Sequence, residues 1–329
     1  MYTHLTFCER EELSRGLVMK ESLGKIAINL RRNKSSLSRE LRRSESTKEN
    51  YRAIHADAYA QIRAMVSKKP RKLENSKQLQ EYVHSHLKLR WSPEQIARTL
   101  KREYSHDRNM QISHESIYTY IYVLARGSLN KELLRCLRQR RKYRRKRGSY
   151  HYQKAVIPNM VSIKERPPEV AGRTIPGHWE GDLIVGKSHR SAIGTLVERT
   201  TRTVILVPLK EKDAVSVRKA FARELKYLPK QMKLTLTYDR GKEMTEHELF
   251  TKQTKIQVYF ADPYSPWQRG SNENTNGLLR QFFPKGTDLS IHSRSYIKHV
   301  QDLMNGRPRK VLNWQTPYES FNQLVALGS

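Results

Sequence analysis

Cysteine is nearly absent from this sequence, which has only Cys8 and Cys136 among its 329 residues. Two cysteines cannot build a disulfide framework or a zinc site, so we expect a protein of the reducing cytoplasm. No apolar run approaches the roughly 18 residues that span a membrane. The charged residues at 9–12 also interrupt the place where a secretory signal would be apolar. These absences argue against secreted and membrane proteins.

Acidic residues are scarce as well. The 32 Asp and Glu face 63 Lys and Arg, which gives a formal net charge of +31 and a mean hydropathy of −0.79. Such a charge opposes compaction unless a polyanion neutralises it, and solubility alone needs a net charge of only about 2–8 for a small domain. Residues 1–150 carry 35 basic and 15 acidic side chains, and residues 151–329 carry 28 and 17. We therefore predict that the protein binds nucleic acid, mainly through its front half.

The length allows two or three domains, and the hydrophobic pattern changes from helical to strand-like after about residue 174. We expect a multidomain chain with all-α DNA-binding domains first and an α/β domain last. The expected boundaries are a helix-turn-helix domain at 1–48, a helical linker at 49–88, a second helix-turn-helix domain at 89–134, a basic linker at 135–172 and the α/β domain at 173–329.

Three short helices are predicted in the first 45 residues. Thr6 and Glu9 form a capping box for the first, a second covers about 22–30, and Ser35 is expected to cap a third at 36–43.

The third helix has one apolar side and one side that suits DNA. Leu37 and Leu41, one turn apart, are expected to point inward. Arginine can grip guanine in the major groove, and serine can meet phosphates or bases. The DNA-facing residues would be Ser35, Ser38, Arg39 and Arg42. A solvated polar face on an ordinary bundle helix is the alternative, but the basic composition favours DNA.

A second helical pair follows the same logic. The run Ser92-Pro93-Glu94-Gln95 provides a cap with proline at the first helical position, and Ser113 caps a helix with Ile117 one turn before Ile121. This pair is a second candidate helix-turn-helix. A plain helical hairpin remains open, because its outer face is less basic.

A strongly basic run separates the two halves. From Arg135 to Arg147, nine of thirteen residues are Lys or Arg. We expect this run, including Arg141, Arg144 and Arg145, to hold phosphates without reading base sequence. A localisation-type or merely solvated tract is the alternative.

The last domain should contain strands near 179–185, 193–198, 202–208, 234–238 and 257–261. Helices are expected at 213–228, 267–283, 293–304 and 317–326. Hairpin strands followed by alternating strands and helices predict a mixed sheet flanked by helices.

Three acids in this domain stand out by position. Asp182 lies inside an otherwise largely apolar strand, Asp239 ends the predicted strand at 234–238, and Glu273 lies in the asparagine-rich helix SNENTN. Asparagine is a poor interior helix former, so three asparagines in this helix suggest a functional role rather than a contribution to helix stability. Carboxylates that meet repel one another, and Mg²⁺ is bound by one or two carboxylates with phosphate oxygens. The alternative is three unrelated carboxylates in surface salt bridges.

The sequence resembles bacterial DDE-type transposases of the Insertion Sequence Thirty family over nearly its whole length. Residues 5–41 are similar to the family's first helix-turn-helix, and WSPEQIARTLKREY with ISHESIYTYIY to the next. The catalytic half carries GHWEGDLIVGK (177–187), TLVERTTRTVILVPL (195–209), LTLTYDRGKEM (234–244), YFADPYSPWQRGSNENTNGLLRQFFPKGTDLS (259–290) and NGRPRKVLNWQTPYE (305–319).

The resemblance implies an RNase H-like catalytic domain in which Asp182, Asp239 and Glu273 bind two Mg²⁺ ions, with Mn²⁺ able to substitute. The 33 residues between Asp239 and Glu273 fit the family's spacing. In such enzymes water attacks a phosphodiester at the element end, and the freed 3′-hydroxyl attacks another DNA strand. The implied partners are the terminal inverted repeats, target DNA and further copies of this chain. The implied place of action is the bacterial cytoplasm, on the nucleoid.

The chain departs from the family pattern at Arg240, where asparagine is usual, at Met244, where phenylalanine is usual, and at Met304-Asn305-Gly306, where Leu-Asn-Asn is usual. Arg240 places a cation beside the expected metal site, where it would contact the scissile phosphate or weaken metal binding.

Further basic residues near the triad are predicted to contact DNA strands: Lys187, Lys242, Arg269, Arg280 and Lys285. Trp267 is expected to close the core, with base stacking as the alternative. His247 would position a phosphate or serve only structure.

A transposase is the leading interpretation. The alternatives are a catalytically weakened copy that binds DNA as a repressor, which Arg240 favours, and a nuclease without strand transfer.

Overall fold

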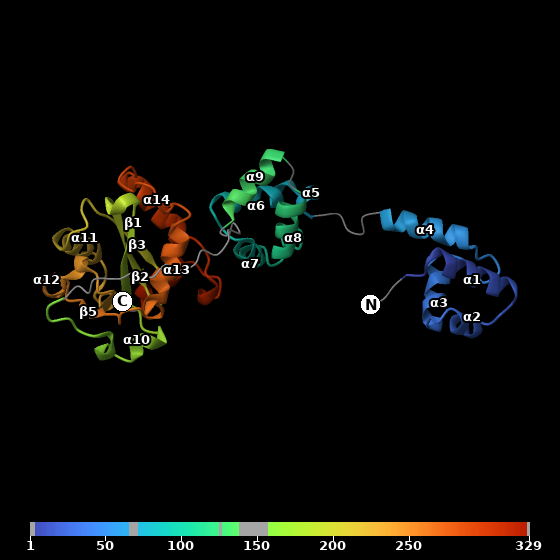
Figure 1. The fold of residues 1–329 in the computed structure, drawn as a ribbon, viewed down its shortest axis with the longest axis horizontal. Coiled ribbons are helices and arrows are strands. Elements are labelled where there is room, and N and C mark those ends of the chain that lie inside the picture. Colours follow the sequence, from blue (N-terminus) through green and yellow to red (C-terminus); the bar gives the residue numbers. More distant parts are fainter. Residues whose placement is uncertain (1–3, 66–71, 125–126, 138–156, 328–329) are drawn as a thin grey trace. The chain divides into compact units, whose positions relative to one another are not determined.

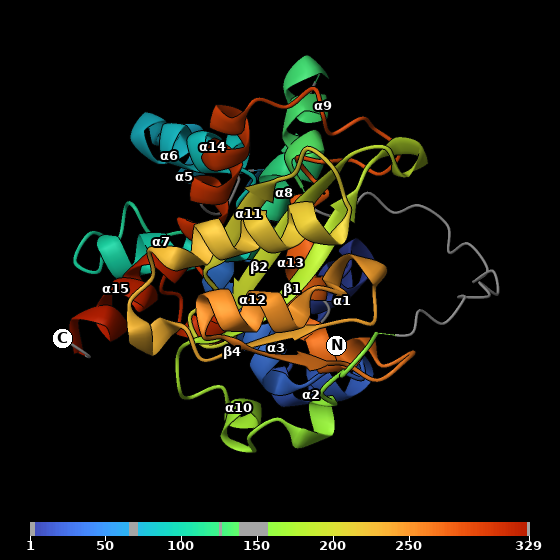
Figure 2. The same cartoon turned by 90° about the vertical axis from the view of Figure 1, so that its left-hand side faces the viewer.

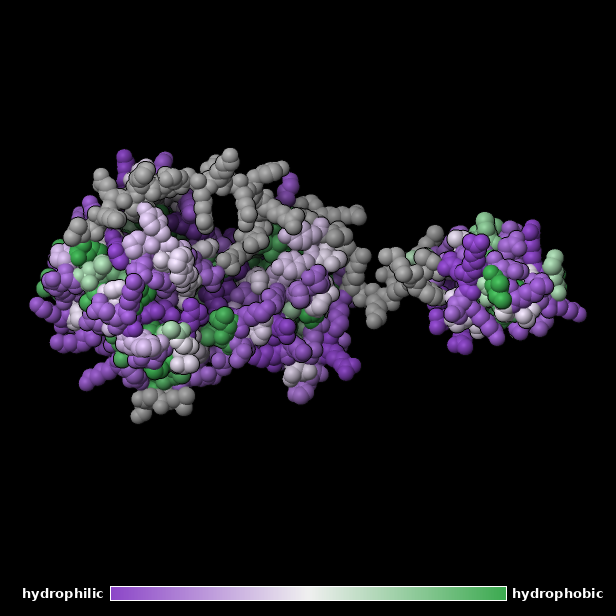
Figure 3. Space-filling view, turned by 60° about the horizontal axis from the view of Figure 1, so that its bottom comes forward, coloured by the Kyte–Doolittle hydropathy of each residue, from purple (hydrophilic) through white to green (hydrophobic). Residues whose placement is uncertain are grey.

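The computed structural model describes residues 4–65, 72–124, 127–137 and 157–327, which form two compact units, Met1–Asn75 and Ser76–Ser329 (Figure 1). Arg141, Arg144 and Arg145 lie outside the described residues. In the described part of the chain, no helix is long and apolar enough to cross a bilayer. Hydrophilic side chains dominate the face shown in Figure 3, and hydrophobic ones form small separate patches.

The first unit is a small helical domain. Its helices are α1 (Phe7–Val18), α2 (Leu23–Asn29), α3 (Lys34–Arg43), α4 (Ala53–Met65) and α5 (Lys72–Asn75). The capping box of Thr6 and Glu9 is present at the start of α1. Only residues 30–33 separate α2 from α3, which is the short turn of a helix-turn-helix.

The cap of α3 differs from the prediction. Asn33, and not Ser35, is the N-cap residue, and its side chain accepts a 2.9 Å hydrogen bond from the Ser35 amide. Asparagine is among the best N-cap residues, and the helix begins at Lys34, two residues before the predicted start.

The two sides of α3 are as predicted. Leu37 and Leu41 are buried in the core of this unit. The four residues expected to face DNA are exposed: Ser35, Ser38, Arg39 and Arg42. Contact with DNA stays a prediction.

A buried ion network joins three helices of the first unit. The Arg10 guanidinium of α1 lies 2.7 Å from the Glu40 carboxylate of α3 and 2.6 Å from the Asp57 carboxylate of α4. Tyr51 and Ala56 complete the same hydrophobic core. Helix α4, which falls inside the linker predicted at 49–88, packs within the first unit, and the predicted domain boundaries stay predictions.

The second unit begins with a helical part. Its helices are α6 (Lys77–Lys88), α7 (Pro93–Glu103), α8 (His114–Thr119), a π-helical turn (Tyr120–Leu124) and α9 (Gly127–Cys136). The predicted caps at Ser92 and Ser113 are present. Residues 104–113 separate α7 from α8, which is longer than the usual helix-turn-helix connection of about 3–4 residues. DNA contact by this pair stays a prediction.

The rest of the second unit contains the mixed sheet that the sequence predicts. The strands are β1 (His178–Val185), β2 (Ala192–Glu198), β3 (Val204–Pro208), β4 (Thr235–Tyr238) and β5 (Gln257–Phe260). Their order is β3-β2-β1-β4-β5. The first three strands pair antiparallel, while β4 pairs parallel with β1 and β5 parallel with β4.

Helices cover both faces of this sheet (Figure 2). One face packs against α11 (Ala214–Lys226) and α12 (His247–Thr254), and the other against α13 (Gly270–Leu279) and α14 (Arg294–Asn305). On β2, Leu196 faces the first core and Val197 the second, which follows from the alternation of side chains along a strand. Two peripheral helices complete the part, α10 (Glu169–Gly172) and α15 (Pro317–Leu327).

Candidate active site

The sheet brings Asp182 and Asp239 together. Glu180 of β1 is paired with Thr237 of β4 in a parallel register. Both aspartates lie two residues further along their chains, so they stand at the same level of neighbouring strands with their side chains on the same face. Asp239 directly follows β4, at the carboxyl end where catalytic groups of open α/β sheets often lie.

A single guanidinium bridges these two carboxylates. Arg269 Nη2 lies 3.0 Å from Asp239 Oδ2, and Arg269 Nη1 lies 3.7 Å from Asp182 Oδ1. Arg269 Nη1 also donates to the Gly181 carbonyl at 3.0 Å, and the side chain is 9% exposed. The cation therefore offsets the repulsion of two nearby carboxylates. The DNA contact predicted for Arg269 stays a prediction, and the structure gives the side chain a second role.

Helix α13 is tied to the strands on either side of Glu273. Asn276 Nδ2 donates to Asp182 Oδ2 at 2.9 Å. Asn272 is fully buried, and its Nδ2 donates to the Glu180 carbonyl at 2.8 Å and to the Thr195 carbonyl at 3.3 Å. Residues three apart share a helix face, so Glu273 lies on the side of α13 where Asn276 meets Asp182. Its own side chain is exposed.

A buried carboxylate below the site secures the start of α13. Glu180 is fully buried, and its carboxylate accepts hydrogen bonds from the backbone N–H of Asn272 and from Arg199 Nη1, both at 2.9 Å. The repeated asparagines of this helix pointed to Asn272 and Asn276, because asparagine is unfavourable inside a helix. Nothing in the strand pattern distinguished Glu180.

The surroundings oppose the charged form of Asp182. Burial raises the pKa of this carboxyl, and the nearby Asp239 charge raises it further, while Arg269 acts in the opposite direction. Burial also raises the pKa of Glu243, which feels the charges of Asp239 and Asp182. A divalent cation would remove this repulsion, and carboxylates are the ligands that Mg²⁺ prefers. The donor set therefore fits such an ion.

The three acids do not form a closed metal cage. Among the described residues, no three His, Cys, Asp or Glu side chains are grouped closely enough to hold a metal ion. The reason lies in the two features above: Arg269 stands between the aspartates, and Glu273 turns to solvent.

Arg240 does not point its charge at the aspartates. Its Nε donates to the Ala261 carbonyl at 3.2 Å, and its Nη2 lies 3.4 Å from Asp262 Oδ1. The side chain is thus held along the start of the loop after β5.

Other predicted residues are placed as follows. Trp267 does not close the core, because it is 71% exposed on the short 3-10 turn before α13. His247 is buried, packs edge-on against Phe260 and has its Nε2 3.2 Å from the Asn159 carbonyl, so it serves structure.

The remaining basic residues differ in exposure. Lys187, Lys242 and Lys285 are exposed. Arg280 is half-buried, donates to the Val185 and Phe283 carbonyls, and has its pKa lowered by burial. Their DNA contacts stay predictions.

Comparison with known proteins gives two family matches. Residues 1–44 match a helix-turn-helix domain, and residues 174–266 match an integrase core domain. The second match contains Asp182 and Asp239 and ends before Glu273.

Long stretches of the chain also align with individual proteins. It is 45% identical over 305 residues to the transposase for insertion sequence element IS1086 of Cupriavidus metallidurans, covering 93% of this chain and 90% of that protein. It is 40% identical over 329 residues to transposase InsI for insertion sequence element IS30A of Escherichia coli, covering 98% of this chain and 85% of that protein. The crystal structure of the catalytic core domain of BIV integrase aligns over 46% of this chain and 97% of its own, with 19% identity and a TM-score of 0.36.

Proposed function

Because this chain belongs to the IS30 family of insertion-sequence transposases, we propose that it binds the terminal inverted repeats of its own element and that Asp182, Asp239 and Glu273 carry out metal-dependent DNA cleavage and strand transfer. The observation that carries this proposal is the parallel register of β1 and β4. It sets two aspartates side by side, beneath the helix that bears Glu273.

The three carboxylates would hold Mg²⁺ or Mn²⁺. Two such ions activate the attacking oxygen and stabilise the leaving oxygen of an in-line displacement. The protein's own groups position the acids: Asn276 orients Asp182, and Asn272 anchors α13. Arg269 offsets the repulsion between Asp182 and Asp239.

Two reactions then follow at one centre. A water oxygen attacks the phosphorus at the element end, the bond from phosphorus to the 3′-oxygen breaks, and this oxygen takes up the proton that water loses, which leaves a 3′-hydroxyl and a 5′-phosphate. This hydroxyl next attacks a phosphodiester of target DNA and displaces a second 3′-hydroxyl. Two element ends must be held together for insertion, so the active form is a dimer or a higher oligomer, working on chromosomal DNA in the bacterial cytoplasm.

A nicking assay tests this function against the repressor alternative. The protein is incubated with the labelled DNA ends that flank its gene, with Mg²⁺ or Mn²⁺. We expect nicked ends and joined products, because the Arg240 charge is directed to Asp262 rather than to Asp182 or Asp239. Binding without any nicking would instead support a repressor, and hydrolysis without joining a nuclease.

The family residue at position 240 provides a direct comparison. We expect Arg240→Asn to nick within about twofold of the unchanged protein, a barrier change of only ~0.4 kcal/mol, because the Arg240 side chain is held by the Ala261 carbonyl and Asp262. A large gain in nicking rate would show that Arg240 restrains the chemistry.

The exposed side of α3 makes a separate prediction. Arg39→Ala and Arg42→Ala should each weaken binding of the terminal repeat by about 1–3 kcal/mol, as loss of a base or phosphate contact does. Competition gel shifts against unrelated DNA measure the specific part. Arg15→Ala is the matched control, since Arg15 is exposed on α1 and pairs only locally with Glu12. Unchanged affinity in both test variants would show that α3 is not the recognition helix.

A further inference from the structure

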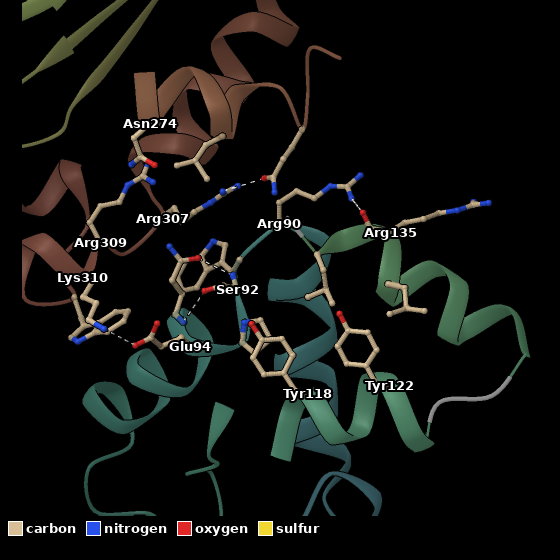
Figure 4. Close-up of a pocket in the computed structure, with 18 of the residues that line it drawn as sticks. Arg90, Ser92, Glu94, Tyr118, Tyr122, Arg135, Asn274, Arg307, Arg309 and Lys310 are labelled. Atoms are coloured by element: carbon tan, nitrogen blue, oxygen red, sulfur yellow. Dashed lines mark hydrogen bonds and ion pairs between the residues drawn. The ribbon is translucent and has the colours of Figure 1, made fainter. Parts of the chain in front are cut away.

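A large groove lies in the second unit between the helices α6–α9 and the C-terminal part of the catalytic domain (Figure 4). Its volume is ≈ 1130 Å³. One wall carries Arg90, Tyr118 and Tyr122, and the other carries Arg309 and Lys310 (Figure 4).

The groove is strongly basic. Its described lining includes six cations and one carboxylate, Glu94. Lys310 is paired with that carboxylate at 3.3 Å. Arg135, the first residue of the basic run 135–147, also lines the groove. A polyanion fits such a surface better than a neutral ligand does.

Aromatic rings alternate with these charges. Tyr118 and Tyr122 lie one turn apart with their rings stacked at 6.2 Å, and Tyr122 is 55% exposed. Trp91 and Trp314 also line the groove. Cationic grooves with aromatic platforms are the usual way in which proteins bind unpaired nucleic-acid strands, because every base can stack on a ring.

The walls of the groove are joined by polar contacts. Gln95 Nε2 donates to the Pro308 carbonyl at 2.6 Å, and Arg102 pairs with Glu319 at 3.1 Å. The Arg98 guanidinium lies 5.6 Å from the centre of the Trp314 ring. The segment 305–319 thus provides the docking surface for α7.

The groove reaches the catalytic helix. Asn274 of α13 lines it, and Asn274 directly follows Glu273. Leu278 and Gln281 continue the same lining. A strand lying in the groove would therefore run to the edge of the proposed active site.

We propose that this groove binds a single DNA strand that leaves the duplex at the element end, with its phosphates on the cations and its bases against Tyr118 and Tyr122. The proposal rests on the proposed function and names the form of DNA that the site takes. Stacking on the two tyrosine rings requires bases that are not already paired in a duplex, and a few nucleotides of one strand fit the volume of ≈ 1130 Å³.

The test compares two forms of the DNA end that flanks this gene, one blunt and one with a short unpaired tail containing 2-aminopurine. Binding is measured in EDTA, so that no cleavage occurs. We expect the protein to bind the tailed end about tenfold more tightly, within the range for one base stacked on an aromatic ring. We also expect the fluorescence of the tail to be quenched on binding. Lys131 is an exposed cation of the same lining. Tyr122→Ala and Lys131→Ala should both lose this preference and keep the affinity for the blunt end.

Tyr227→Ala and Lys101→Ala are matched controls, because both residues are exposed and lie outside the groove. Equal affinity of the unchanged protein for both ends would overturn the proposal. So would a preference that survives in both groove variants, or an equal loss of blunt-end affinity, which would mean that the groove holds duplex DNA. Tail preference without any nicking in Mg²⁺ would overturn the catalytic function and leave the groove standing.

Discussion

Alanine in place of Asp182, Asp239 or Glu273 is expected to abolish strand cleavage and strand transfer while binding of the DNA end survives. Loss of an essential catalytic group costs roughly 10³-fold or more in rate. Each carboxylate contributes oxygens that the others cannot replace, because Asp182 and Asp239 come from different strands and Glu273 from the helix above them. DNA binding should persist, because its main surface is predicted on the first unit.

The measurement is product analysis on labelled ends in Mg²⁺, with gel shifts of the same proteins. Glu248→Ala is the matched control, since Glu248 is an exposed carboxylate on α12. Asp182→Asn keeps the shape and the bond from Asn276 and should still be inactive, which separates lost charge from lost packing. Normal strand transfer in any one of the three alanine variants would refute the triad.

Glu180→Ala is expected to reduce both stability and catalysis. Removing one partner of a buried ion pair costs about 3–5 kcal/mol, because the remaining charge stays buried and uncompensated. Here the remaining charge is Arg199, which is 4% exposed. The Asn272 amide also loses its acceptor, so the start of α13 is free to shift. A displacement of about 1 Å at the reacting groups can cost roughly 10²-fold in rate.

Tryptophan fluorescence during urea unfolding measures the stability of the second unit by itself, since Trp91, Trp179, Trp267 and Trp314 all lie within it. The double variant Glu180→Leu with Arg199→Met removes both charges and should recover much of the stability. It should not recover the rate, because the Asn272 amide still lacks its acceptor. A Glu180→Ala protein with unchanged stability and rate would contradict this account of the helix anchor.

Regular elements were predictable wherever side-chain periodicity was strong. The five strands and the long helices α11, α13 and α14 lie close to their predicted positions, and the caps at Thr6, Ser92 and Ser113 are present. Local chemistry was less decisive where two candidates competed, as at Asn33 and Ser35. Helix α12 was not predicted.

The sequence by itself determined the basic character of the protein, its order of helical and mixed-sheet parts, and the acids that its family resemblance implies for catalysis. These follow from composition, from periodicity and from spacing, which are properties of the chain before it folds. Only the tertiary structure decided which groups meet: Arg269 between two aspartates, Glu180 under α13, Trp267 in solvent and α4 packed on α1. Such contacts join residues far apart in the chain, and their energies depend on burial and on the neighbouring charge, which no local pattern records.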